Sequence, residues 1–432
     1  MMNQSRLTIA ATLILGLARV HTPAVAATIT VHNGESIQTA VTNAAPGDTV
    51  VVESGSYQEG VEGGTAVTID KSLTLVASTS LADPEANPTV ILEAKPRQTQ
   101  GIYVSPPQGD EPMYGDIANY INNVTIKGFT VRNFQNNGIY LQYVNNYWIE
   151  HNRSENNQEN GIFPTLSANG TVRKNVAYGS ADSALWVEAS ENVRVIDNEL
   201  FNSPTGLEVT ISKNVEMTGN LVHDNVTGVG LYHPSAAGLG AKSPTGDDWP
   251  TGDWRLVNNQ IYNNNLENTA PSGSMPAALP SGGGVLVLGV DRVQVVRNKI
   301  ENNDFYGIAV IDWCTAVAST AMAGPAAIGG QSFDCISSPP AVEPYPDNNM
   351  FGRNILNDNG LNPPPVQDQP FALFASDLTD FVMTMPPDTS LPGDHFNLFC
   401  ANTSDTREFP TRKFPEKPLG QPIELSDWCP GL

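Results

Sequence analysis

The chain has 432 residues, with 45 Asp and Glu against 22 Lys and Arg, a formal net charge of −23 and only 16% charged residues. It also holds 41 Asn and 37 Gly, and because both types are poor helix formers, the composition disfavours a helical bundle. A hydrophobic fraction of 40% is too high for a disordered chain. The negative charge argues against nucleic acid as a partner, since phosphate binding needs basic patches.

Residues 1–26 are typical of a secretory signal peptide. A basic start with Arg6 precedes the apolar run Leu7 to Leu17 and the cleavage pattern Ala24-Val25-Ala26. The run is shorter than the roughly 20 residues that cross a bilayer, so we expect no transmembrane anchor. Removal of residues 1–26 takes away Arg6 and Arg19 and leaves a mature charge of 20 − 45 = −25. We therefore expect an exported protein, periplasmic or secreted.

An Asn-centred pattern then recurs along the chain. Asn152, Asn175, Asn198 and Asn220 follow one another at steps of 23, 23 and 22 residues, and later copies at Asn259, Asn298 and Asn354 follow at steps of 39, 39 and 56. Each unit holds three short alternating apolar stretches, which predict strands. Asn and Gly between them tolerate the left-handed conformation of a sharp corner. Three strands and three corners make one coil of a parallel β-helix, in which we interpret the Asn residues as corner builders that stack in ladders and not as ligands.

This repeat predicts an all-β chain whose β-helix domain covers residues 27–362 in about 9–10 coils. At residues 27–47 a strand and a short amphipathic helix, with Ile37 and Val41 on one face, would cap the open end of the coils. Loop insertions are expected at 234–253, 266–282 and 314–346. Residues 363–432 lack the repeat and predict a Pro-rich, irregular C-terminal cap.

All four cysteines, Cys314, Cys335, Cys400 and Cys429, lie in the last third of the chain. None forms a C-x-x-C pair of the kind that zinc or redox sites use. In an oxidising compartment we expect two structural disulfides. Pairing neighbours in sequence, Cys314 with Cys335 and Cys400 with Cys429, is the connectivity we favour of the three available.

The start of the mature chain and the repeat that follows it together resemble a known group of proteins. The segment SIQTAVTNAAPGDTVVVESGSYQE, followed by N-x-I-x-x-N and N-G-I coils, resembles right-handed parallel β-helix proteins of the pectin-lyase-like superfamily. More narrowly, it resembles an exported bacterial family of β-helix repeat proteins whose function is not settled. The resemblance spans roughly Thr28 to Asn362 and implies the fold. The superfamily contains lyases, hydrolases, epimerases, adhesins and non-enzymes, so the resemblance implies no single activity.

Aligning the strand after each Gly predicts which side chains point outward. With Ile139, Ile162, Leu185, Leu207, Val229, Val285 and Ile308 inward, one outward row reads Tyr140, Phe163, Trp186, Glu208, Gly230, Leu286, Ala309. A second row reads Gln142, Thr165, Glu188, Thr210, Tyr232, Leu288, Ile311, and His233, Asp312 and Trp313 follow the strand ends. The three insertions emerge at the edges of this face, as the walls of a binding cleft would. The alternative interpretation is that these aromatic side chains serve sheet formation alone.

Aromatic rings beside carboxylates suit sugar rings, so Tyr140, Phe163, Trp186 and Trp313 are the candidate substrate-binding residues. The candidate catalytic residues are Glu188, Glu208, Tyr232, His233 and Asp312. Glu188 and Glu208 stand one coil and two residues apart, or about 8 Å between Cα atoms. That falls within the roughly 6.5–9.5 Å carboxyl separation of inverting glycosidases. Polygalacturonases of this fold, however, carry N-T-D, paired-Asp, G-H-G and R-I-K motifs. In this chain Asp247-Asp248 weakly resembles the paired Asp, and the other motifs are missing.

A lyase or epimerase needs a base and a cation beside the uronate carboxyl group. Tyr232-His233-Pro234 weakly resembles the Asp-Pro-His-Asp region of alginate epimerases, but both flanking Asp residues are missing. The aligned face shows no Arg or Lys. Ca²⁺ held by Asp247, Asp248, Asp253 or Asp312 could replace that cation, and a solvated acidic loop is the plainer interpretation of these Asp residues.

Two functions follow from these patterns. The first is an exported protein that binds and modifies a polysaccharide on this face, by lyase, epimerase or hydrolase chemistry. The second is a non-catalytic envelope or secreted scaffold that works with a protein partner. The negative charge repels polyuronates and favours neutral sugars, amino sugars or calcium-bridged polyanions. We expect a monomer.

Overall fold

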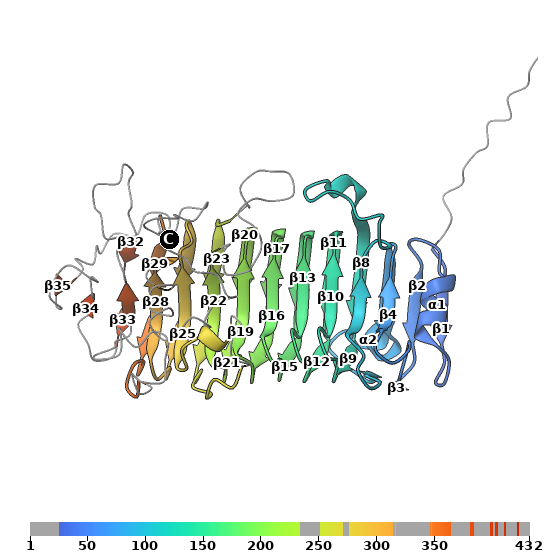
Figure 1. The fold of residues 1–432 in the computed structure, drawn as a ribbon, viewed down its shortest axis with the longest axis horizontal. Helices are drawn as coiled ribbons and strands as arrows, with labels where there is room; N and C mark the ends of the chain where they lie inside the picture. The colour runs from blue at the N-terminus through green and yellow to red at the C-terminus, as the bar shows by residue number, and fades with distance from the viewer. Residues whose placement is uncertain are drawn as a thin grey trace, which may run out of the picture.

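The computed structural model describes residues 26–233, 251–270, 276–313, 316, 346, 348–363, 381–383, 398–400, 402–404, 410–411 and 421–422. In Figure 1 the strands stack side by side into one elongated body, with α1 and β1 at one end and β32 and β33 toward the other. Neighbouring strands run parallel within three sheets. No helix in the described part of the chain is long and apolar enough to cross a membrane.

Each coil contributes one strand to each sheet. Sheet A contains β1 (Thr28–Val31), β2 (Thr49–Val52), β5 (Leu73–Ala77), β8 (Ile121–Lys127), β11 (Val144–Glu150), β14 (Ala168–Arg173), β17 (Glu191–Ile196), β20 (Lys213–Thr218), β23 (Trp254–Val257), β26 (Val293–Val296), β29 (Met350–Gly352) and β32 (Leu398–Cys400). Sheet B contains β3 (Gly55–Tyr57), β6 (Val90–Glu93), β9 (Phe129–Arg132), β12 (Arg153–Glu155), β15 (Val176–Tyr178), β18 (Glu199–Phe201), β21 (Leu221–His223), β24 (Gln260–Tyr262), β27 (Lys299–Glu301), β30 (Ile355–Asn357) and β33 (Thr403–Ser404). Sheet C contains β4 (Thr65–Ile69), β7 (Gln100–Val104), β10 (Ile139–Gln142), β13 (Ile162–Thr165), β16 (Ser183–Glu188), β19 (Thr205–Thr210), β22 (Thr227–Tyr232), β25 (Gly283–Leu288), β28 (Tyr306–Ile311) and β31 (Phe381–Met383).

The remaining elements are short. They are the α-helices α1 (Ile37–Asn43) and α2 (Ser78–Ala82), the 3₁₀ turns η1 (Ile117–Asn119) and η3 (Pro276–Ala278), and the antiparallel pair β34 (Pro410–Thr411) and β35 (Gln421–Pro422). The sequence predicted the α1 helix, in which Ser36 caps the first turn and Ile37 and Val41 are buried against the core. Its capping role stays a prediction.

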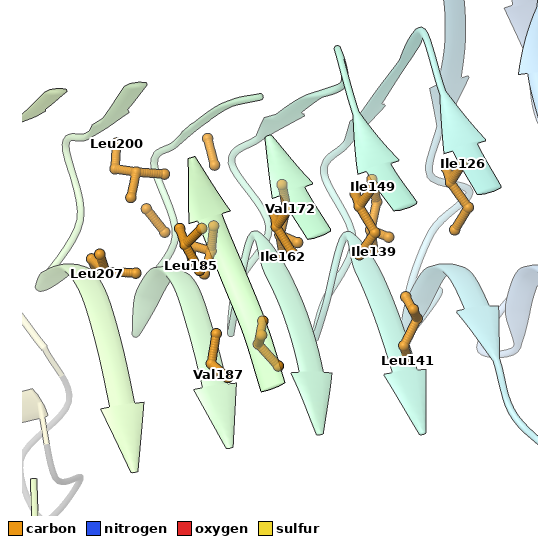
Figure 2. Close-up of a cluster of buried hydrophobic side chains, with 14 of the residues drawn as sticks. Ile126, Ile139, Leu141, Ile149, Ile162, Val172, Leu185, Val187, Leu200 and Leu207 are labelled. Atoms are coloured by element: carbon orange, nitrogen blue, oxygen red, sulfur yellow. The ribbon is translucent and has the colours of Figure 1, made fainter. Parts of the chain in front are cut away.

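The core runs through the middle of the coils, where like residues of successive coils stack on one another. Figure 2 shows Ile139, Ile162, Leu185 and Leu207 pointing into this space from consecutive sheet C strands. All seven side chains that the sequence predicted to point inward are fully buried. All seven belong to the central core cluster, whereas the buried outward residues Tyr232, Leu286 and Leu288 belong to a separate cluster, which confirms the predicted alternation of these strands.

The Asn side chains form the predicted ladders, but the left-handed corners lie one residue earlier. Asn198 donates from Nδ2 to Oδ1 of Asn220 at 3.0 Å and to the Val172 carbonyl at 3.0 Å. The residue with positive φ is the one before each ladder Asn, and it is Lys174 in one coil and Asp197 in the next. The ladder Asn is therefore selected for its hydrogen bonds, and the corner itself accepts several residue types.

The β-helix continues beyond the predicted boundary at residue 362. Strands β31, β32 and β33 pair in parallel with β28, β29 and β30. Asn402 accepts from Asn354 Nδ2 at 2.9 Å, which extends the Asn ladder by one coil. The sequence missed this coil because Asn402 lacks the second Asn or Ser that follows each earlier ladder Asn by five residues.

The disulfide prediction falls on residues that the structure leaves undescribed. Cys314, Cys335 and Cys429 lie outside the described residues, and for Cys400 only the backbone at the end of β32 is described. The pairing therefore stays a prediction. The same holds for most of the insertions at 234–253 and 314–346.

Candidate functional site

The strand register confirms the two predicted outward rows of sheet C. Trp186 pairs with Glu208 and Glu208 with Gly230, while Glu188 pairs with Thr210 and Thr210 with Tyr232. Glu188 and Glu208 therefore share one face and stand one coil and two residues apart. We call the outward side chains of β7 to β28 the sheet C face.

An aromatic ladder occupies the N-terminal part of this face. Tyr103 stacks on Tyr140 at 5.0 Å between ring centroids, Tyr140 on Phe163 at 5.1 Å and Phe163 on Trp186 at 4.5 Å, all nearly parallel. Both faces of the Tyr140 and Phe163 rings are thus covered by neighbouring rings. This geometry argues against the prediction that sugars stack on Tyr140 and Phe163. Among the described residues, Phe163 is the one ring that stacks on Trp186, and Trp186 Nε1 donates to Thr210 Oγ1 at 2.8 Å.

Beyond Trp186 the face carries an acid cluster, which we define as Asp182, Glu188 and Glu208. Glu208 Oε2 accepts from Ser183 Oγ at 2.6 Å. Glu188 Oε2 accepts from Thr165 Oγ1 at 2.9 Å. Glu188 and Glu208 are 8% and 6% exposed, and Asp182 is half-buried at the start of β16. The two glutamates are therefore largely withdrawn from solvent, and Asp182 is the most accessible of the three acids.

The acid cluster holds its protons more tightly than free carboxyls do. Burial raises the pKa of Glu188 to about 7, opposed by the Thr165 hydrogen bond and reinforced by the charges of Asp182 and Glu159. Burial, together with the charge of Asp182, holds the pKa of Glu208 well above its usual range. Burial and the charge of Glu159 likewise raise the pKa of Asp182. The mutual repulsion of these groups keeps them from ionising together near neutral pH.

The sequence reasoning missed Asp182, Ser183 and Glu159. Asp182 N donates to the Glu159 carbonyl at 3.0 Å, and these two residues occupy the same position in successive coils. Both residues lie in the corner that precedes the sheet C strand, outside the two aligned rows. The 23-residue spacing from Glu159 to Asp182 was the available signal.

Tyr232 lies beside the acid cluster but inside the protein. It is fully buried, its ring lies over Gly230, the next residue along the row from Glu208, and its hydroxyl faces the buried hydroxyl of Thr205. Burial and the charge of Glu208 raise its pKa well above the usual range. Tyr232 therefore stays protonated at neutral pH.

The other predicted residues lie in a covered part of the face, away from the acids. His233, Asp312 and Trp313 are fully buried, and the His233 and Trp313 rings stack at 5.3 Å. A second hydrophobic cluster formed by Tyr232, Leu279, Leu286, Leu288, Tyr306, Ile311, Trp313 and neighbouring residues fills this region. Asp312 follows β28, three strands from the Glu208 strand, so it is about 14 Å or more away. This burial argues against sugar contact by Trp313 and against one catalytic set that joins Asp312 to the glutamates.

The metal prediction gains no support from the described residues. Asp247 and Asp248 lie outside them, and Asp253 pairs with Arg292 Nε at 3.1 Å at the edge of sheet A. Across the described ranges no group of three His, Cys, Asp or Glu residues is arranged to hold a metal ion. A calcium site that uses the undescribed Asp residues stays a prediction.

The sheet C face carries acidic side chains, and the described strands of this sheet carry no basic ones. Its strands, β4 to β31 within the described residues, contain no Lys or Arg. Sheets A and B carry cations beside their acids, such as Lys127 and Arg173 in sheet A and Arg132 in sheet B. The acid cluster therefore has no basic neighbour on its own sheet.

Comparison with known proteins identifies the fold. A family model described as a right-handed beta helix region matches residues 99–240. The A-module of mannuronan C-5 epimerase AlgE4 from Azotobacter vinelandii is similar in structure, with a TM-score of 0.55 and 13% identity over 83% of this chain and 79% of that chain. The AlgE6 A-module of the same organism has a TM-score of 0.55 and 14% identity over 85% of this chain and 81% of that chain. Sequence comparison with curated proteins finds no match.

Together these matches define the class of protein. The chain has a right-handed parallel β-helix fold, as the resemblance implied. Likeness at this level of identity shows the fold and leaves the activity to be argued from the site.

Proposed function

We propose that this chain is an exported protein that binds a polysaccharide on the sheet C face and modifies it at the acid cluster. The observation that carries the proposal is the placement of Asp182, Glu188 and Glu208 on two adjacent strands of one outward face, at the end of the Trp186 ladder. Carboxyls whose pKa values are raised toward neutrality can donate a proton to a leaving group, while an ionised neighbour accepts one. Two structurally similar proteins are named as mannuronan C-5 epimerases, so this fold supports polysaccharide chemistry.

Hydrolysis of a glycosidic bond is the reaction that this geometry supports best. The Glu188 and Glu208 Cα atoms are about 8 Å apart by their register, which suits a pair of carboxyls around the bond and a water. Lyase and epimerase chemistry needs a cation to neutralise the uronate carboxyl group. The described sheet C strands supply none.

A panel of polysaccharides tests the proposal, with three readouts: new reducing ends, absorbance of unsaturated uronates and equilibrium binding. We expect reducing ends, and we expect Glu188→Gln, Glu208→Gln and Asp182→Asn each to lower the rate by about 100-fold or more. Glu216→Gln, on the outward face of sheet A, is the matched control and should keep full activity. Full activity in all three acid variants would refute the assignment, and unsaturated products would identify a lyase instead.

A non-catalytic scaffold is the second candidate. The self-stacked rings and the covered cluster around Trp313 favour it, because both consolidate the fold instead of presenting side chains to a ligand. This alternative predicts glycan or protein binding with no turnover in any of the assays above.

Export is part of the same proposal. Cleavage after Ala26 would leave a mature chain that starts at Ala27. N-terminal sequencing of the protein recovered from periplasm and medium tests this cleavage and distinguishes the two locations.

A further inference from the structure

Trp148 presents an indole ring on the outward face of sheet A. It is 37% exposed, whereas the other tryptophans that the structure describes are half-buried or buried. Its register partners in the two adjacent coils are Thr125 and Thr171, whose side chains are too small to cover an indole. The ring is therefore open to a ligand, unlike the Phe163 ring, which neighbouring rings cover on both faces.

Two cations flank this ring. Lys127 and Arg173 each stand one coil and two residues from Trp148, or about 8 Å between Cα atoms. They share one carboxylate, because Glu150 Oε1 lies 3.2 Å from Lys127 Nζ and Glu150 Oε2 accepts from Arg173 Nε at 2.6 Å. Strands β8, β11 and β14 hold no other charged residue, so this part of sheet A carries a surplus positive charge.

The charges around these three strands are paired with one another. Lys174 Nζ lies 2.8 Å from a Glu85 carboxylate oxygen, and Arg194 Nε lies 3.9 Å from one of Glu216. Each pair sums to zero, so the surplus beside Trp148 is unchanged. It is the opposite of the charge on the sheet C face.

An amide row borders the ring on the side away from the cations. Asn123, Asn146 and Asn169 each precede a member of the Trp148 row by two residues, and they are exposed or half-buried. Asn146 Nδ2 donates to Asn123 Oδ1, and Asn169 Oδ1 accepts from Asn192 Nδ2 at 3.1 Å. A carboxamide has two N–H donors and two acceptor positions, so a ladder bond leaves further ones for the hydroxyls of a sugar.

We propose that sheet A holds a second glycan-binding site, centred on Trp148, that takes a sugar unit bearing an acidic group. The sugar ring packs on the open indole, its hydroxyls bond the amide row, and its acidic group pairs with Arg173 and Lys127. The net charge of −23 does not prevent this binding, because charges beyond about 8 Å are largely screened at physiological ionic strength. The site is separate from the sheet C face, so the inference goes beyond the proposed function and does not rest on it.

Two galacturonic acid tetramers, one with free carboxylates and one fully methyl-esterified, test the inference by isothermal titration calorimetry with the full chain. The two share their sugar rings and differ in charge. At physiological ionic strength we expect the free acid to bind about tenfold more tightly than the ester. This ratio of affinities should fall as salt is added. Equal affinity for the two tetramers, or no binding of the free acid, would overturn the inference.

Variants of the full chain locate the binding on sheet A. Trp148→Ala should weaken the binding of both tetramers by about tenfold. Arg173→Gln should bring the ratio between the tetramers toward one, and Glu150→Gln, which removes the competing carboxylate, should raise it. Ile355→Ala truncates an exposed apolar side chain on sheet B, so it is the matched control and should keep both affinities.

Circular dichroism of each variant confirms that it folds. Unchanged affinity in Trp148→Ala, or a ratio that survives Arg173→Gln, would overturn the inference. The proposed function is tested separately by the reducing-end assay of the sheet C variants, so either one can fail while the other stands.

Discussion

The Asn ladder and the acid cluster both bring like side chains of adjacent coils together, with opposite results. The ladder Asn residues stack directly on one another, whereas Glu188 and Glu208 stand on adjacent coils with an offset of two residues. Asn220 Nδ2 donates to Asn259 Oδ1 at 2.9 Å while Asn220 Oδ1 accepts from Asn198 Nδ2 at 3.0 Å, so each amide satisfies the next. Glu188 and Glu208 have no such reciprocal bond and accept instead from Thr165 and Ser183.

The difference follows from the donor and acceptor inventory of the two groups. An amide carries both donors and an acceptor, whereas an ionised carboxylate only accepts. A ladder of amides is therefore stable at any pH. A group of neighbouring acids is stable only while the acids are protonated or accept hydrogen bonds from other groups. Keeping buried acids next to one another costs free energy of folding, and the β-helix does not need them in order to form. Residues that are kept at such a cost are typical of functional sites.

The largest expected effect is at the centre of the Asn ladder. Asn220→Ala removes four hydrogen bonds and leaves the Asn198 backbone N–H and its Nδ2 without their shared acceptor. Unsatisfied buried donors cost about 1–3 kcal/mol each, so we expect a loss of about 4 kcal/mol in the free energy of unfolding. Chemical denaturation of the purified variant measures it. A loss below about 1 kcal/mol would show that the ladder does not hold the coils together.

The acid cluster should make stability depend on pH. Because burial raises the pKa of Glu188 from its ordinary 4.5 to about 7, the folded state binds this proton more tightly than the unfolded state. Glu188 therefore stabilises the fold at low pH, and its contribution, up to about 3 kcal/mol, is lost as the pH rises through about 7. Denaturation curves at a series of pH values measure this fall in the free energy of unfolding.

Glu188→Gln replaces the carboxyl with an amide of the same shape, so the fall between about pH 4.5 and 7 should become shallower. Glu216→Gln, which changes an acid on sheet A, should leave the pH curve as it is. An unchanged curve in Glu188→Gln would show that this carboxyl titrates normally and would remove the contrast with the Asn ladder.

The sequence predicted most of the fold because the fold is periodic. Asn152 to Asn220 recur at a nearly constant step, and a constant step with alternating strands defines both the coil and its outward rows. The last coil was missed because Asn402 lacks the second Asn or Ser that follows each earlier ladder Asn by five residues. Arg407 stands at that position, so the motif itself is lost.

The site was predicted only in part, for physical reasons. The register follows from the repeat, so Glu188 and Glu208 were placed correctly on one face. Burial by chain that covers the face does not follow from the repeat, so the burial of His233 and Trp313 could not be predicted from it. The stacking of Phe163 between two rings was likewise implied by the coil spacing but not considered.

A smaller effect is expected in the aromatic ladder. Phe163→Leu removes ring contacts at 5.1 and 4.5 Å with Tyr140 and Trp186, which should cost about 1–2 kcal/mol of stability. Affinity for a glycan should not change, because neighbouring rings already cover both ring faces. Thermal unfolding and titration with the best ligand of the panel measure the two quantities. A tenfold loss of affinity with unchanged stability would restore the ladder as a sugar-binding surface.

The smallest effect is expected on the solvent side of the same repeat. Asn192 donates to Asn169 at 3.1 Å and accepts from Asn214 at 2.7 Å, as the buried ladder does, but it is exposed and has a φ of 56°. Asn192→Gly keeps this backbone conformation and removes only the side-chain bonds. Water replaces those bonds, so the free energy of unfolding should change by less than about 0.5 kcal/mol. A loss as large as that of Asn220→Ala would mean that ladder geometry alone, and not burial, makes stacked amides stabilising.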